Sequence, residues 1–173
     1  MHTGSRSASR AWPPNGPNSN STSPGLWSAT SSLCLVSGLA VFRRRELGDS
    51  PLFLIAAGIL TAMLALDDAF LIHERVAPTY LHVPQIGVFA AYAGSMAAFL
   101  VYFVLRILRT DFLLLGIALG FLGLSMAVDA VLPFSNRETF IEDSFKFAGI
   151  VFWLTYFACS ARAILRGEPG AAA

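Results

Sequence analysis

The chain has 173 residues, of which 55% are apolar and only 13% are charged, and its formal net charge is +1. The charged fraction is about half that of a typical soluble domain, so a lipid bilayer is the expected surrounding. The charges fall between apolar blocks and form no basic patch, which excludes nucleic acid as a partner. Cys34 and Cys159 stand singly in different apolar runs. They predict buried thiols and no CxxC site.

The two ends of the chain differ from its middle. Residues 1–25 are rich in Ser, Asn, Pro and Gly without apolar periodicity, which predicts a disordered segment. A short Gly, Pro and Ala tail, 166–173, is expected to be disordered as well. Residues 26–165 are predicted to form one transmembrane helical domain.

Five apolar runs in this domain predict an all-α fold, a polytopic membrane bundle of five transmembrane helices. Ser50-Pro51 is typical of a helix start, and Thr139 to Glu142 reads as a capping box that begins the last helix near Phe140. Pro133 is expected to stop the fourth helix. The predicted helices cover residues 26–42, 51–73, 84–108, 112–132 and 140–163.

Small residues recur at every fourth position in the third predicted helix and, as Gly116-x-x-x-Gly120, in the fourth. Such faces let a neighbouring backbone approach closely. The third run is therefore predicted to be the main packing helix, through the rows Gly87, Ala91, Ser95 and Ala90, Gly94, Ala98.

The distribution of Lys and Arg predicts the orientation. If five helices alternate, Arg43, Arg44, Arg45, Arg106, Arg109, Arg162 and Arg166 share one side, against Arg6, Arg10, Arg75, Arg137 and Lys146. The side richer in arginine is expected to be cytoplasmic, so the N-terminus lies outside and the C-terminus inside. The predicted location is the cell membrane, plasma or inner.

Three charges are predicted at one depth in the bilayer. From the cytoplasmic side, three of the helices run about 16 apolar residues, roughly 24 Å, before a charge appears. These charges are Asp67, Asp129 and Lys146. Charged side chains at membrane depth usually mark a functional site. The competing interpretation places the membrane surface at these charges, which then reach into the headgroups.

One functional interpretation is a proton- or cation-binding site near the outer leaflet. Its candidate residues are Asp67, Asp68, Glu74, Asp129, Asp143 and Lys146, with His73 at its mouth. Lys146 among carboxylates is expected to stay charged and to contact Asp67, Asp68 or Asp129. Carboxylates around one lysine are suited to holding and releasing protons.

Two alternatives stay open, and so does the question of whether the protein is an enzyme. In the first, His73 and Asp68, with His82, Asp67 or Glu74, hold zinc or iron in a membrane-embedded hydrolase. In the second, the polar cluster only fixes helix packing, and the chain is a non-catalytic subunit of a homo-oligomer or of a larger membrane assembly.

Overall fold

The computed structural model describes residues 22–43, 50–70, 72–131 and 136–167, and these are almost entirely helical, with no strand among them. The all-α prediction is therefore confirmed. In chain order the elements are α1 (Thr22–Arg43), α2 (Ser50–Phe70), a π-helix η2 (Ile72–Leu81), α3 (Gln85–Tyr102), a short α4 (Val104–Leu108), α5 (Phe112–Val131) and α6 (Asn136–Arg166).

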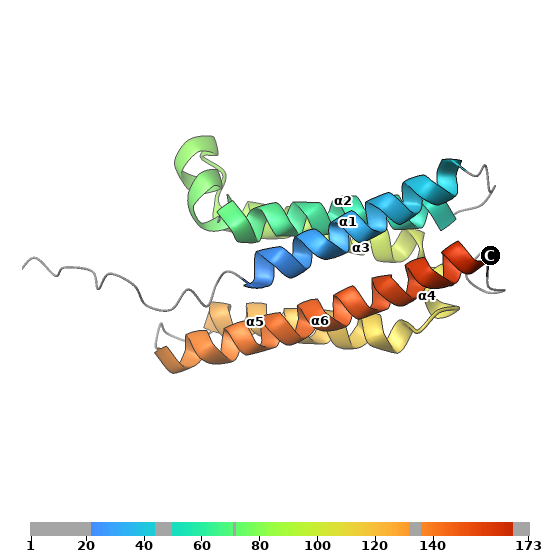
Figure 1. The fold of residues 1–173 in the computed structure, drawn as a ribbon. Helices are drawn as coiled ribbons and strands as arrows, with labels where there is room; N and C mark the ends of the chain where they lie inside the picture. The colour runs from blue at the N-terminus through green and yellow to red at the C-terminus, as the bar shows by residue number, and fades with distance from the viewer. Residues whose placement is uncertain (1–21, 44–49, 71, 132–135, 168–173) are drawn as a thin grey trace, which may run out of the picture.

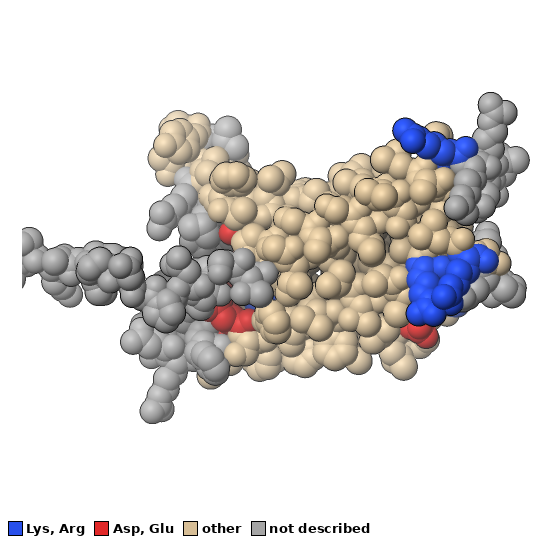
Figure 2. All heavy atoms as spheres, in the orientation of Figure 1, with Lys and Arg blue, Asp and Glu red and all other residues tan. Residues whose placement is uncertain are grey.

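Three helices are long and apolar enough to cross a membrane, over Ser23–Arg43, Ser50–Phe70 and Ile141–Arg166. Two shorter apolar helices cover Ile86–Tyr102 and Phe112–Val128. On the face drawn in Figure 2, the middle of the molecule is an uncharged belt, with charged side chains at its two ends. Such a belt between charged ends is the surface that a bilayer requires.

The helices form two antiparallel hairpins, α1–α2 and α5–α6, which pack together mainly through α1 and α6 (Figure 1). Glycines make the close crossings possible. A Cβ atom on Gly38 would lie 2.8 Å from Ile55 Cγ1, and one on Gly58 would lie 2.7 Å from Leu35 Cγ. Gly149 serves the second hairpin in the same way. Each of these helices therefore approaches its partner where a side chain is missing.

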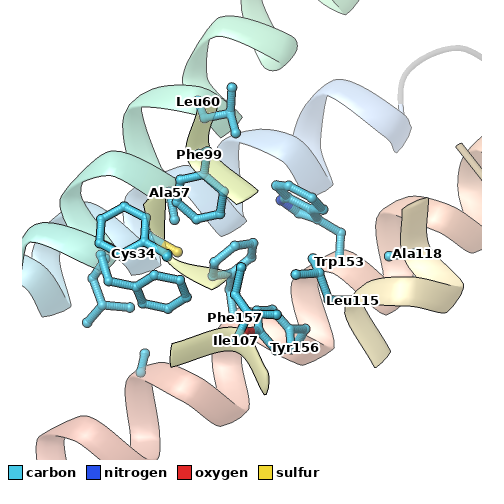
Figure 3. Packing of buried hydrophobic residues seen from close by; sticks show 14 of the residues in the cluster. Cys34, Ala57, Leu60, Phe99, Ile107, Leu115, Ala118, Trp153, Tyr156 and Phe157 are labelled. Atoms are coloured by element: carbon cyan, nitrogen blue, oxygen red, sulfur yellow. The ribbon is translucent and has the colours of Figure 1, made fainter. Parts of the chain in front are cut away.

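An aromatic core joins α3 to the two hairpins (Figure 3). Phe53 of α2 packs edge-on against Phe103, with ring centroids 5.2 Å apart, and stacks on Phe99 of α3 at 5.6 Å. Phe157 of α6 lies 5.8 Å from Phe53 and 4.9 Å from Trp153. The C-terminal half of α3 is thus anchored by large rings.

Several boundaries differ from those predicted. Much of the segment between the second and third predicted helices belongs to η2, which extends the chain beyond α2 in helical form. The third predicted helix is divided at Phe103, whose backbone (φ −102°, ψ 16°) leaves the helical region while its ring enters the core. The last helix begins at Asn136, so the Thr139 to Glu142 pattern lies inside it and does not start it.

The small residues of α3 do not pack as predicted. Ala90, Ala91, Gly94, Ser95 and Ala98 are exposed, and a Cβ atom on Gly94 would meet nothing within 4 Å. The contacts of α3 come from its large side chains, because burying a phenyl ring removes far more apolar surface than burying a methyl group does. Cys34 is buried as predicted, but Cys159 is exposed on α6.

Candidate functional site

Two consecutive carboxylates stand near the end of α2. The helix carries no charge from Pro51 to Leu66, and Asp67 and Asp68 follow one turn before its end at Phe70. Consecutive residues point about 100° apart around a helix, so the two aspartates face different neighbours. Asp67 is buried and Asp68 is nearly so.

Asp67 is bonded to α3. The Tyr92 hydroxyl donates a hydrogen bond to Asp67 Oδ1 over 2.9 Å. A hydrogen bond to a charged group contributes more than one between neutral groups. Asp67 has further interactions besides this one. This bond links the loosely packed N-terminal half of α3 to the end of α2.

Asp68 is bonded to α6. Lys146 Nζ donates to Asp68 Oδ1, forming an ion pair between residues 78 positions apart in the chain. The Asp68 side chain is only 11% exposed, and that of Lys146 is 33% exposed. The second oxygen, Asp68 Oδ2, is buried and has no hydrogen-bond partner among the described residues. A buried carboxylate oxygen without a donor is costly, because a buried acceptor loses its hydrogen bonds to water.

The structure brings Asp67, Asp68 and Lys146 to one end of the bundle. Lys146 contacts a carboxylate of the second predicted helix, as the depth argument requires. Asp143 lies three residues before Lys146 on α6, is half-buried and belongs to neither pair. The side chains of Glu74 and Asp129, two further candidates, are outside the described part of the chain.

The metal hypothesis receives no geometric support from the side chains that can be placed. Among the described residues, no three His, Cys, Asp or Glu side chains lie close enough to share a metal ion. The side chain of His73, its central ligand, is not among them. His82 is exposed at the turn before α3, where its backbone takes a positive φ of 54°.

Sequence reasoning missed Tyr92, which binds Asp67, and it treated Arg106 only as a flanking charge. The Arg106 side chain is buried at the opposite end of the bundle. Its Nη2 donates to Ser50 Oγ over 2.8 Å, and its guanidinium lies 5.2 Å from the centre of the Phe53 ring. The break at Phe103 separates α4, which carries this arginine, from α3. No signal in the sequence marks that break.

Comparison with known proteins places the chain in a family. A family model described as a domain of unknown function (DUF8692) matches residues 19–160. The chain belongs to this family. No curated protein and no solved structure matches the chain significantly. The matched region takes in both aspartates, Tyr92 and Lys146, so the candidate site lies within the family domain.

Proposed function

We propose that this member of the DUF8692 family is a five-span protein of the cell membrane, and that Asp68, paired with Lys146, takes up and releases protons near its outer surface. The carrying observation is that Asp67 and Asp68, at the end of an apolar helix, are each bonded by a donor from a different helix. Charges inside an apolar bundle cost free energy, and their retention is typical of ion or proton sites.

The proposed topology has the N-terminus outside and the C-terminus inside. The long helices alternate in direction, which gathers the end of α1, the start of α2 and the end of α6 at one end of the molecule (Figure 1). Lys and Arg side chains gather at that same end (Figure 2). The arginines there include Arg43 and Arg166, the last residues of α1 and α6. The positive-inside rule favours the cytoplasm for this end.

Single-cysteine labelling tests the topology, in a protein whose Cys34 and Cys159 are replaced by alanine. Thr79 and Arg109 are both exposed, and Thr79 precedes α3 in the chain whereas Arg109 follows it. A cysteine at Thr79 is expected to react with a membrane-impermeant maleimide in intact cells. A cysteine at Arg109 is expected to react only after permeabilisation, and the reverse pattern would contradict the orientation.

Proton exchange is favoured because Asp68 Oδ2 is buried and has no hydrogen-bond partner among the described residues, while Oδ1 contacts the Lys146 ammonium group. Taking up a proton on Asp68 Oδ2 converts the ion pair into a neutral acid beside Lys146. Giving the proton up restores the pair. The two states differ in how strongly α2 is held to α6, so proton binding is linked to helix packing.

Infrared titration of the purified protein in detergent tests this exchange. The absorption of protonated carboxyl groups is expected to rise as the pH falls, and part of that rise should disappear in Asp68→Asn, because an amide cannot ionise. Asp111→Asn is the matched control, since Asp111 is exposed at the other end of the molecule. Identical titrations of the wild type and Asp68→Asn, over the pH range in which both are folded, would refute the proposal.

A second candidate function is purely structural, and one observation favours it: the Asp68–Lys146 pair joins α2 to α6, as the Trp153–Thr61 hydrogen bond and the Phe53–Phe157 ring contact also do. Interhelical polar contacts in membranes contribute about 1 kcal/mol each. A double-mutant cycle with Asp68→Asn and Lys146→Met measures this coupling. Coupling without an Asp68-dependent titration would leave the packing role alone.

A further inference from the structure

Asp68 already contacts a positive charge that belongs to the protein itself. Lys146 comes from α6, and its ammonium contacts Asp68 Oδ1. An ammonium group is a compact point charge with three donors and no acceptor. It therefore occupies the position at the carboxylate in which a bound metal cation would sit.

A second hydrogen-bond donor of the site comes from α3. Tyr92, on α3, gives its hydroxyl hydrogen to Asp67, so one oxygen of each aspartate already accepts a hydrogen bond. The described titratable groups on the helices that meet here are Asp67 on α2, Tyr92 on α3, and Glu142 and Asp143, which precede Lys146 on α6. Ca²⁺ takes about six to eight oxygen ligands, which carboxylates and water together can supply, whereas a proton needs one.

We infer that Lys146 determines the specificity of the site, acting as a tethered cation that excludes metal cations from Asp68, while a proton can still add to Asp68 Oδ2. The inference rests on the proposed proton exchange and adds the basis of its selectivity. A metal cation at Asp68 would be repelled by the Lys146 ammonium group, because water screens charges poorly at a partly buried site. A proton enters as a covalent O–H bond on Asp68 Oδ2, which has no hydrogen-bond partner in the described part of the chain, and leaves Lys146 where it is.

The test is thermal unfolding of the purified full chain in detergent, in NaCl or CaCl₂ against choline chloride at equal ionic strength and at pH 7 and 9. The wild type is expected to show no difference between the salts. Lys146→Gln removes the tethered charge. Its Tm should be about 3 °C or more higher in NaCl or CaCl₂ than in choline chloride, because a bound cation stabilises the folded state. Lys146→Arg keeps the charge and should behave as the wild type does.

Asp68→Asn combined with Lys146→Gln is the control that locates the gained cation, and it should lose the shift. A gain in Lys146→Gln that this double variant lacks supports the inference. A salt-specific shift in the wild type that Asp68→Asn abolishes would overturn it, and so would the absence of any gain in Lys146→Gln at both pH values.

If Lys146→Gln does not fold, Lys146→Met carries the same comparison with an apolar side chain of similar length. If neither variant folds, the wild type alone decides, through the presence or absence of an Asp68-dependent salt response. The infrared titration is independent of this test. A protein that titrates at Asp68 but binds Na⁺ or Ca²⁺ there retains the proposed function and refutes only the role of Lys146.

Discussion

Glycine-to-alanine substitutions should separate the crossings inside the bundle from the glycines on its surface. A Cβ atom on Gly58 would lie 2.7 Å from Leu35 Cγ and 3.1 Å from the backbone nitrogen of Leu35. Carbon atoms pack best at about 3.5–4.0 Å, so the overlap with Leu35 Cγ is roughly 1 Å. The backbone nitrogen of Leu35 cannot rotate away as a side chain can. Gly58→Ala must therefore push α1 and α2 apart.

The expected magnitude follows from two opposing effects. Overpacking costs about 1–3 kcal/mol, while alanine gains up to about 1 kcal/mol over glycine in helix propensity. Gly58→Ala should lose about 1–2 kcal/mol of unfolding free energy. Gly120→Ala meets nothing within 4 Å and should be neutral or slightly stabilising. The same chemical change then differs by roughly 2 kcal/mol between the two positions, which corresponds to about 5 °C in Tm.

Thermal unfolding of the purified variants in one detergent measures this difference. Gly149→Ala should destabilise the protein as Gly58→Ala does, because its Cβ would lie 2.7 Å from Leu122 Cγ. Gly94→Ala should be as neutral as Gly120→Ala. The assignment of crossings would be refuted if Gly58→Ala and Gly149→Ala were as stable as the two surface variants.

Two further substitutions test the polar contacts at the ends of the bundle. Tyr92→Phe removes the hydroxyl that donates to Asp67 and should cost about 1–3 kcal/mol in chemical unfolding, whereas Tyr102→Phe, at an exposed tyrosine of the same helix, should cost almost nothing. Arg106→Met should cost about 2 kcal/mol by the same measurement, because it removes a hydrogen bond and a cation–π contact. Arg109→Met, at an exposed arginine, is its control, and equal losses in the two arginine variants would contradict the buried role.

The apolar runs and the charges between them predicted the helical class, because helix length and apolar content are local properties of the chain. The same arithmetic placed Asp67 and Lys146 at one level, since helical rise is constant and both residues end apolar stretches of similar length. The contact of Lys146 with a carboxylate of the second helix was predictable for this reason.

Which aspartate meets which partner depended on the tertiary structure. Asp67 and Asp68 are neighbours in the chain, and only the rotation of α2 against α3 and α6 assigns Tyr92 to the first and Lys146 to the second. The helix break at Phe103 was likewise decided by packing, because the aromatic core holds that ring inside.

The sequence did not predict which of the small residues lie at helix crossings. Spacing alone cannot distinguish Gly58, which lies at a helix crossing, from Gly94 and Gly120, where an added Cβ atom would meet nothing within 4 Å. Both kinds of glycine stand in apolar helices with small residues a turn away. The sequence by itself determined that helices with small-residue faces would form. Only the placement of one helix against another decided which of those faces are used, because close packing depends on atoms that are distant in the chain.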